Sequence, residues 1–314
     1  MDIGIRGLLS PGIRYIFSRQ NIDEQNLLEV RLRINEPILL LYSHGEYVLP
    51  DDAGAGYIVK QEDIRTTLDL ISGYSLYAYE NEIRQGFITV KGGHRVGFAG
   101  QVILEDGRIK SMKHISFLNI RVSHEVKGCG IKCLPYIIDK QRVLNTLIVS
   151  PPGCGKTTLL RDLVRLLSDG SSMMTGVNVG VVDERSELAA CYQGVPQRSL
   201  GMRTDVLDGC PKASGMLMLL RSMNPKVIAV DEIGDRQDVE AINYVINCGC
   251  SILATIHGTN IDDIRTRPVL RSLVELKMFD RYIVIDGDEG VGTIGNIFDE
   301  RGNELYMPLL SVAN

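Results

Sequence analysis

A glycine-rich segment behind a buried-strand pattern constrains the fold of this chain most. Residues 142–150, "RVLNTLIVS", form an apolar and β-branched run that is typical of a strand buried in a parallel sheet. "PPGCGKTT" follows, and the helical spacing of apolar residues runs from Lys156 to Leu167. A strand, a glycine-rich loop and a helix in this order direct backbone N–H groups and a helix N-terminus toward a phosphate. The segment therefore predicts a phosphate-binding loop rather than a turn that happens to precede a helix.

Each residue type in this loop suits part of a nucleoside triphosphate bound with Mg²⁺. Glycines allow the tight turns that wrap N–H groups around a phosphate, Lys156 reaches the β and γ oxygens, and Thr157 offers its hydroxyl to the metal. The first glycine of the pattern is replaced by Ser150, which with the following prolines must turn the chain differently. The residues expected to bind the nucleotide are Pro152, Gly153, Cys154, Gly155, Lys156, Thr157 and Thr158.

Two acids follow the apolar run "VIAV" further along the chain. Acids at a strand end are often only solvated, but parallel strands end at the same sheet edge as the loop, where ligands of open α/β folds bind. Asp231 is therefore expected to hold Mg²⁺ together with Thr157, and Glu232 is expected to orient the attacking water. No Asn-Lys-x-Asp element that reads guanine is present, which favours ATP.

Two further strand ends point to the same edge. "VVDERSELA" places Asp183 and Glu184 there, and "ATIHGTN" places Thr255 and His257 there. His257 is either a structural histidine or a sensor of the γ-phosphate. Asp183 or Glu184 either takes part in catalysis, the role we assign to Glu184, or caps a helix predicted at residues 185–192.

The order of elements divides the chain. Strands at "VNVGVVD", "KVIAVDE" and "SILATIH" alternate with helices at 211–223 and 236–247, which predicts a three-layer α/β domain with a mostly parallel sheet over residues 141–314. The tail predicts a meander at the sheet edge, with turns at 286–287, 289–290 and 301–302. Residues 1–125 predict a smaller mixed α+β domain, and residues 126–140 a linker. The first domain combines helical spacing at 8–17 and 64–71, strands "EVRLRI", "PILLLY" and "FITV", and a hairpin turn at Asp106-Gly107.

The composition limits the partners, the compartment and the metal sites that we expect for this chain. The net charge is −5, with the acidic excess in residues 141–314, so no nucleic-acid partner is expected. No apolar run is long enough to span a bilayer and no secretion signal is recognised, which favours the cytoplasm. The seven cysteines contain no CxxC pair and are expected to be reduced thiols rather than zinc ligands.

Several motifs resemble those of one group of ATPases. "VVDERSE", "VIAVDEIGD" and "TIHGTN" are similar to the aspartate box, second Walker motif and histidine box of the traffic ATPases of type II and type IV secretion and pilus retraction. More narrowly, "EVRLRINEPI", "GGHRVGFAG", "RTDVLDGCPKASGMLMLLRSMNPKVIAVDEIGD" and "ATIHG" resemble the stage III sporulation AA family over nearly the whole chain. The missing cysteine zinc motif argues against the type II branch, and Gly258 after His257 differs from the pilus-motor pattern.

This resemblance implies a RecA-like P-loop ATPase domain preceded by a regulatory or oligomerisation domain. It implies a Mg²⁺-dependent ATPase that forms a homo-hexameric ring and works with membrane-anchored components of a secretion-like channel from mother cell to forespore. The protein would lie peripherally at the inner face of the mother-cell membrane. Two alternatives remain open: a RecA-like translocase stimulated by nucleic acid, and an ATP-dependent assembly switch or scaffold.

The resemblance also implies that a basic residue senses a nucleotide bound between the two domains. The candidates are Arg95, Arg121 and Arg203. Arg121 is assigned to nucleotide binding and Arg203, in a predicted irregular loop, to catalysis. Each is otherwise an ordinary ion pair, whereas Arg31 and Arg33 are expected on a solvated strand face.

Overall fold

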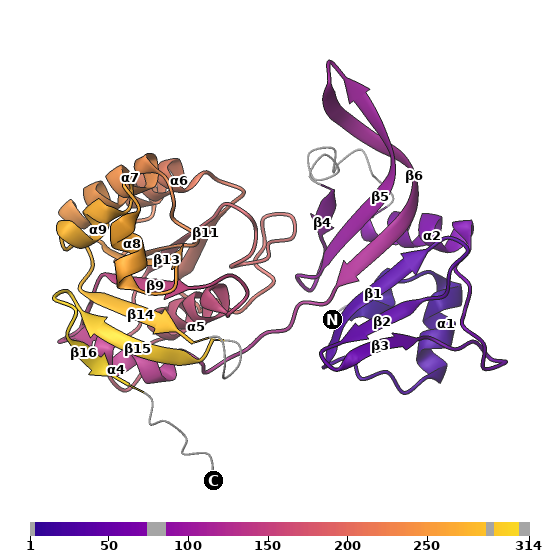
Figure 1. The fold of residues 1–314 in the computed structure, drawn as a ribbon, viewed down its shortest axis with the longest axis horizontal. Coiled ribbons are helices and arrows are strands. Elements are labelled where there is room, and N and C mark those ends of the chain that lie inside the picture. The colour runs from indigo at the N-terminus through magenta and orange to yellow at the C-terminus, as the bar shows by residue number, and fades with distance from the viewer. Residues whose placement is uncertain (1–3, 74–85, 287–291, 308–314) are drawn as a thin grey trace, which may run out of the picture. The chain divides into compact units, whose positions relative to one another are not determined.

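A computed structural model describes residues 4–73, 86–286 and 292–307, which divide into two compact units (Figure 1). The first unit is Met1–His124 and the second is Glu125–Asn314. The segment expected to be a linker instead contains η3 (Ile131–Cys133) and α4 (Leu134–Ile137). Cys133 and Ile137 are fully buried in the core of the second unit. This apolar segment therefore belongs to the second unit, because its side chains gain from burial there.

The first unit is a mixed α+β structure built on a six-stranded antiparallel sheet. Its strand order is β3-β2-β1-β6-β5-β4. In the described part of this unit, η1 (Ile5–Leu8) and two α-helices supply side chains to one core cluster on one side of the sheet. The helices are α1 (Pro11–Arg19) and α2 (Gln61–Ile71). The strands are β1 (Leu27–Arg33), β2 (Leu39–Tyr42), β3 (Gly45–Val48), β4 (Phe87–Thr89), β5 (Arg95–Glu105) and β6 (Arg108–Arg121).

The β5–β6 connection confirms the predicted hairpin turn. Leu104 pairs with Ile109 and Glu105 with Arg108, so Asp106 and Gly107 form a two-residue loop. Both residues have positive φ, 51° and 73° respectively, as a type I′ turn requires. An Asp-Gly pair supplies these angles at low steric cost.

The second unit contains the predicted, mostly parallel sheet. Its eight strands have the order β11-β10-β12-β13-β9-β14-β15-β16, and the strands from β11 to β14 run parallel. The antiparallel β14-β15-β16 meander forms one edge, as predicted. The strands are β9 (Thr146–Ser150), β10 (Val179–Asp183), β11 (Thr204–Asp208), β12 (Val227–Val230), β13 (Ser251–His257), β14 (Arg281–Ile285), β15 (Ile294–Asp299) and β16 (Glu304–Tyr306). A separate pair joins β7 (Ile138–Asp139) to β8 (Arg142–Val143).

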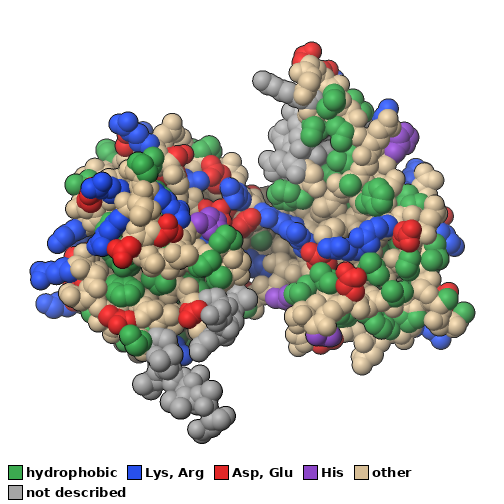
Figure 2. All heavy atoms as spheres, viewed as in Figure 1, with side chains coloured by type: hydrophobic (Ala, Val, Ile, Leu, Met, Phe, Trp, Pro, Cys, Tyr) green, Lys and Arg blue, Asp and Glu red, His purple; other side chains and the backbone are tan. Residues whose placement is uncertain are grey.

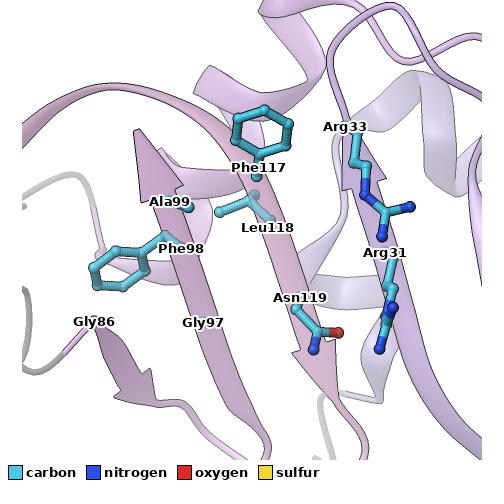
Figure 3. A pocket seen from close by; sticks show the side chains of 9 residues that line it. All are labelled: Arg31, Arg33, Gly86, Gly97, Phe98, Ala99, Phe117, Leu118 and Asn119. Carbon is cyan, nitrogen blue, oxygen red and sulfur yellow. The ribbon is translucent and has the colours of Figure 1, made fainter. Parts of the chain in front are cut away.

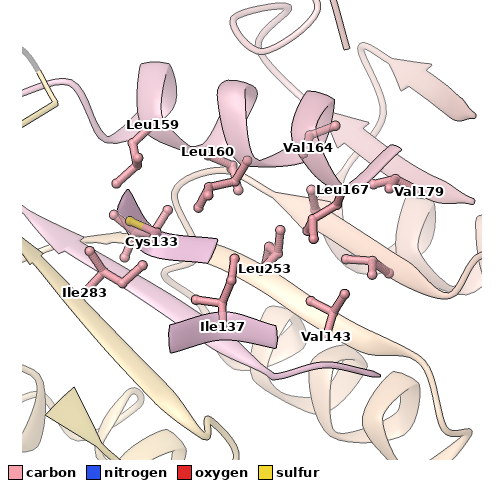
Figure 4. Close-up of a cluster of buried hydrophobic side chains, with 14 of the residues drawn as sticks. Cys133, Ile137, Val143, Leu159, Leu160, Val164, Leu167, Val179, Leu253 and Ile283 are labelled. Atoms are coloured by element: carbon pink, nitrogen blue, oxygen red, sulfur yellow. The ribbon is translucent and has the colours of Figure 1, made fainter. Parts of the chain in front are cut away.

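Helices cover both faces of this sheet. The α5 helix (Lys156–Asp169) packs on one face with α4, and Figure 4 shows Leu160 and Val164 of α5 above Leu253. On β9, Ile148 belongs to this cluster, whereas Leu147 and Val149 belong to the cluster on the other face. That face carries α6 (Lys212–Ser222), α7 (Arg236–Asn247), α8 (Ile261–Thr266) and α9 (Arg271–Glu275). None of the helices in the described ranges is both long and apolar enough to cross a membrane.

Two local predictions in this unit are wrong. Residues 185–192 form a loop rather than a helix, because Ser186 and Ala190 adopt positive φ of 52° and 48°, which interrupts a right-handed helix. Residues 204–208, predicted as irregular, form the edge strand β11, where mostly half-buried side chains give a weak hydrophobic pattern. Gly302 has a φ of 85° in the turn predicted at 301–302, and the turns predicted at 286–287 and 289–290 extend outside the described residues.

Candidate nucleotide-binding site

The carboxyl edge of the sheet brings together side chains that lie far apart in the sequence. The strands β10, β12, β13 and β9 are adjacent and parallel, so the residues after each strand lie at one edge. His257 pairs directly with Ser150, the last residue before the glycine-rich loop. Asp231 and Glu232 follow β12, which lies two strands from β9 in the sheet. The parallel register therefore assembles the predicted acids, histidine and loop at the place where α/β folds bind ligands.

The glycine-rich loop has the backbone conformation expected for binding an anion. Gly153 and Gly155 have φ of 81° and 94°, in the region that favours glycine. A Cβ atom at Gly153 would meet no atom within 4 Å, so the conformation and not the available space requires glycine there. No side chain caps the N-terminus of α5, which leaves its first N–H groups for a ligand.

Ser150 fits the strand end without the usual glycine. It is fully buried at the end of β9, and its hydroxyl donates to the carbonyl of Pro151 at 2.9 Å. Its own carbonyl accepts the N–H of Gly258 at 3.1 Å, which ties the loop to the segment after β13. On the far side of the loop, the carbonyl of Cys154 accepts the N–H of Gly292 at 2.8 Å. The loop is therefore held at both ends by its neighbours.

Asp231 and Thr157 form the pair of oxygen donors predicted for Mg²⁺. The Thr157 hydroxyl donates to Asp231 Oδ2 at 2.6 Å, and the Thr255 hydroxyl donates to Oδ1. Burial raises the pKa of Asp231, while these two hydrogen bonds act in the opposite direction. A hydroxyl and a carboxylate fit Mg²⁺, which prefers oxygen ligands and retains water and phosphate in its shell. Among the residues the structure describes, no group of three His, Cys, Asp or Glu side chains could hold a metal by itself.

Glu232 is surrounded by three basic side chains. Its Oε1 accepts a hydrogen bond from Lys156 Nζ at 2.9 Å and lies 3.0 Å from His257 Nε2, while its Oε2 accepts one from Arg185 at 2.6 Å. Burial alone would raise the pKa of this carboxyl. The hydrogen bond from Lys156 and the charges of Lys156, His257 and Arg185 outweigh burial and lower that pKa. Glu232 is therefore an ionised carboxylate at neutral pH. Its φ of 55° is unusual for glutamate and marks a strained backbone conformation at this edge.

His257 lies at this edge beside Glu232, a position that is compatible with both interpretations of the sequence, a structural histidine and a sensor of the γ-phosphate. Besides the contact with Glu232, its carbonyl accepts a hydrogen bond from Arg267 at 2.7 Å. Its Nδ1 atom is buried and has no hydrogen-bond partner in the described part of the chain. A ligand at this edge could supply that partner, but a contact between His257 and a phosphate remains a prediction.

Asp183 has a structural role that differs from both roles predicted from the sequence, catalysis and the capping of a helix. Its carboxylate is almost fully buried and accepts the N–H groups of Glu187 and Ala189, both at 2.8 Å. It therefore organises a loop rather than capping a helix. Burial raises the pKa of Asp183 against the effect of these backbone hydrogen bonds.

Glu184 and Arg185 bring further charge to the site. Glu184 forms an ion pair with Lys212 of α6. A small pocket is lined by Asp183, Glu184, Arg185, Glu187, Lys212, Asp231 and Glu232. Arg185 and Lys212 were not predicted from the sequence as residues of the site. A signal for Arg185 was present, since it directly follows the two acids at the end of β10.

The structure places Arg203, for which a catalytic role was predicted, at the opposite edge of the sheet from the glycine-rich loop of its own chain. This residue precedes β11 at the amino edge of the sheet, where Thr204 pairs with Val179. Its guanidinium donates to the carbonyl of Ser168, near the C-terminus of α5, at 2.9 Å. The 14-residue helix α5 separates this contact from Lys156 by about 18 Å at 1.5 Å per residue. Arg203 is therefore outside the site formed by its own chain.

The other arginines considered lie on the sheet of the first unit. Arg121 is mostly exposed and lies 3.4 Å from Glu29, whereas the Arg95 guanidinium lies 4.6 Å from the centre of the Phe87 ring. Arg31 and Arg33 alternate with the buried Val30 and Leu32, as expected for the face of the strand away from the core, and they line a pocket there (Figure 3). A contact between Arg121 and a nucleotide remains a prediction.

Charges of both signs are mixed on the visible surface of the second unit. Figure 2 shows Asp and Glu side chains interspersed among Lys and Arg side chains there.

Comparisons with known proteins agree with this fold. The chain matches the family model described as "Sporulation stage III, protein AA" over residues 3–305. It is 45% identical over 287 residues to the stage III sporulation protein AA of Bacillus subtilis (strain 168), which covers 90% of this chain and 91% of that protein.

Two solved structures have a fold similar to that of this chain. The ATPase DotB of Yersinia pseudotuberculosis has a TM-score of 0.60 at 12% identity, over 93% of this chain and 80% of that one. The pilus retraction motor PilT, crystallised with bound ADP, has a TM-score of 0.57 at 15% identity, over 86% of this chain and 77% of that one. At such low identity these likenesses establish the fold alone.

Proposed function

Because this chain belongs to the sporulation stage III protein AA family, we propose that it is a Mg²⁺-dependent ATPase that acts as a ring-forming motor in sporulation. The observation that carries the proposal is the convergence of Lys156, the Thr157–Asp231 pair and Glu232 at one sheet edge. These groups match the lysine, metal ligands and water-orienting acid that phosphoryl transfer to water requires. Two structural neighbours of the same fold, an ATPase and a pilus retraction motor crystallised with ADP, add support.

The mechanism assigns roles to six side chains. Lys156 leaves Glu232 and neutralises charge on the terminal phosphate, which frees Glu232 Oε1 to orient the attacking water. Thr157 and Asp231 would hold Mg²⁺, which when bound neutralises the developing charge on the phosphates. His257 and Glu184, at the ends of neighbouring strands, are proposed to sense the γ-phosphate and to assist charge movement in the site.

The expected oligomer and its partners are inferred from the family to which the chain belongs and not from the geometry of the site. We expect a homo-hexamer that works with membrane-anchored components of a secretion-like channel and lies at the mother-cell membrane without spanning it. Residues 1–125 would regulate or oligomerise the ATPase unit, and Arg121 would contribute to nucleotide binding. We expect no nucleic-acid partner, since the acidic excess of the second half opposes binding to phosphates.

Phosphate release by the purified chain tests the proposal. Wild-type protein should hydrolyse ATP only with Mg²⁺, Lys156→Ala should lose turnover, and Glu232→Gln should bind ATP but hydrolyse it about 10²–10⁴-fold more slowly. Lys226→Ala, an exposed lysine outside the site, is the matched control. Mass measurements with and without ATP report ring formation. Turnover by Glu232→Gln at the wild-type rate would refute the assignment of the acid.

A further inference from the structure

The loop that follows β10 is anchored on several sides. The Asp183 carboxylate accepts two N–H groups of the loop, and the Ser186 hydroxyl donates to Asp208 at 2.5 Å. From α5, Arg161 donates to the carbonyls of Glu187 and Leu188, both at 2.6 Å. The helix that begins with Lys156 therefore also fixes this loop. Arg185 lies within the anchored stretch, so its backbone position is defined.

Arg185 and Lys156 hold different oxygens of the same carboxylate. The guanidinium of Arg185 donates to Glu232 Oε2 at 2.6 Å, whereas the ammonium of Lys156 donates to Oε1 at 2.9 Å. His257 also approaches Oε1, at 3.0 Å. Oε1 thus faces the glycine-rich loop and β13, and Oε2 faces the anchored loop after β10. The two oxygens have separate partners.

A triphosphate in the proposed site would take Lys156 away from Oε1 and would leave Oε2 with Arg185. Lys156 cannot bind the phosphate and remain fully paired with Glu232, so Oε1 loses its nearest cation when ATP binds. The Glu232 side chain is only 18% exposed, and a mostly buried carboxylate without a hydrogen-bonded cation is unfavourable. The contact with Arg185 is outside the path of Lys156. It can therefore persist in both states.

We propose that Arg185 is a positioning residue that holds Glu232 through Oε2 while Oε1 passes from Lys156 to the attacking water. This inference rests on the proposed ATPase function. Arginine suits the role because its planar guanidinium fixes the direction of a carboxylate, whereas a lysine ammonium is a point charge on a flexible chain. Because the Arg185 side chain is 66% exposed, water screens the pair and the expected effect is moderate.

Two roles for Arg185 predict different behaviour in a double-mutant cycle. A residue that acts through Glu232 has no further effect once Glu232 is replaced by glutamine. A residue that touches the phosphate directly loses the same factor in either background. The affinity for ATP distinguishes the two roles even where turnover cannot be measured. Without Arg185, Glu232 depends more on its pairing with Lys156. The phosphate then competes less well with Glu232 for Lys156, so ATP binds more weakly.

The experiment compares Arg185→Ala and Arg185→Lys with and without Glu232→Gln. We measure kcat for ATP and the Kd of a non-hydrolysable ATP analogue. Arg185→Ala should lower kcat about 5–20-fold and weaken analogue binding about 2–5-fold, and Arg185→Lys should recover part of each loss. In the Glu232→Gln background the same change should alter the Kd less than twofold. Arg236→Ala, which removes an exposed arginine paired with Glu240, should change neither quantity.

Each failure has a distinct signature. Wild-type values of kcat and Kd for Arg185→Ala would overturn the role of Arg185 while leaving the ATPase intact. Equal losses of analogue affinity in both backgrounds would overturn it in favour of direct phosphate contact. A wild-type protein that binds the analogue without hydrolysing ATP would refute the proposed function, and the affinity cycle would still decide whether Arg185 acts through Glu232. A wild-type protein that does not bind the analogue would overturn both.

Discussion

The Thr157 hydroxyl donates a hydrogen bond to Asp231 Oδ2 at 2.6 Å. The two residues belong to the first turn of α5 and to the end of β12, and β13 lies between β12 and β9 in the sheet. Thr255 of that intervening strand donates to the other oxygen of Asp231 and accepts the N–H of Glu232 at 2.9 Å. The carboxylate is thus held in one orientation by two hydroxyl groups, which would reduce the cost of forming the proposed metal site.

Removal of the Thr157 hydroxyl should weaken the use of Mg²⁺. We expect Thr157→Ala to raise the Mg²⁺ concentration for half-maximal hydrolysis about tenfold, which corresponds to about 1.4 kcal/mol for one lost ligand. The measurement is a Mg²⁺ titration at saturating ATP. Thr266→Ala, which removes an exposed hydroxyl bonded to the carbonyl of Asp263, should leave the midpoint unchanged. An unchanged midpoint in Thr157→Ala would remove this residue from the metal site.

The Lys156–Glu232 ion pair should oppose ATP binding. The phosphate must displace Glu232 from Lys156, whose side chain is only 7% exposed. Glu232→Gln keeps a similar shape but weakens the pair, so it should bind a non-hydrolysable ATP analogue about 3–10-fold more tightly than wild type, a gain of about 1 kcal/mol. Equilibrium binding measured by fluorescence checks this, with Glu240→Gln on the surface of α7 as control. Weaker binding by Glu232→Gln would show that the pair does not compete with phosphate.

The strand ends of the second unit were predictable from sequence because buried parallel strands are continuous apolar runs. β12 and β13 are buried along almost their whole length, and polar residues mark where each one ends. The positions of Asp231, Glu232 and His257 at one edge follow from that pattern together with the parallel order of strands. The hydrophobic pattern and the polar residues at the strand ends therefore allowed the fold and most of the residues at the carboxyl edge to be predicted.

The errors arose where tertiary contacts override local pattern. The segment "RSELAACY" has good helix formers, but the buried Asp183 carboxylate binds its N–H groups in a loop. β11 is a partly exposed edge strand with little periodicity, so Arg203 was placed in a loop and assigned to the site. The contact between Arg185 and Glu232 joins residues from different strand ends. Only the three-dimensional arrangement reveals such a pairing.

Arg203 should contribute to stability and not to turnover by its own chain. Its Nη1 donates to the Ser168 carbonyl at 2.9 Å and lies close to Gly176, although the residue as a whole is exposed. Arg203→Ala should lower the free energy of unfolding by about 0.5–1.5 kcal/mol. Turnover per folded molecule should stay within about twofold of wild type.

Urea denaturation and phosphate release test this expectation together. Arg221→Ala, at an exposed position in the last turn of α6, is the control and should change neither quantity. A large loss of turnover by Arg203→Ala with an unchanged unfolding midpoint would return this arginine to catalysis, for example across an interface between subunits.

Alkylation of the seven cysteines should show which thiols are buried and whether a nucleotide occupies the glycine-rich loop. Burial raises the pKa of the Cys133, Cys191 and Cys250 thiols to about 12 in each case. Because the thiolate is the reactive form, these three should resist iodoacetamide in the folded protein at pH 8. Cys248 is exposed and should react readily.

Cys154 should respond to ATP in the same experiment. It is partly exposed between Gly153 and Gly155, where phosphates would occupy the space around the loop. We expect ATP with Mg²⁺ to slow its alkylation about tenfold or more at saturation, as followed by peptide mass spectrometry, since protection scales with the fraction of occupied sites. Cys248 serves as the internal control, because its rate should not depend on ATP. Alkylation of Cys154 at the same rate with and without saturating ATP would mean that the nucleotide does not bind at this loop.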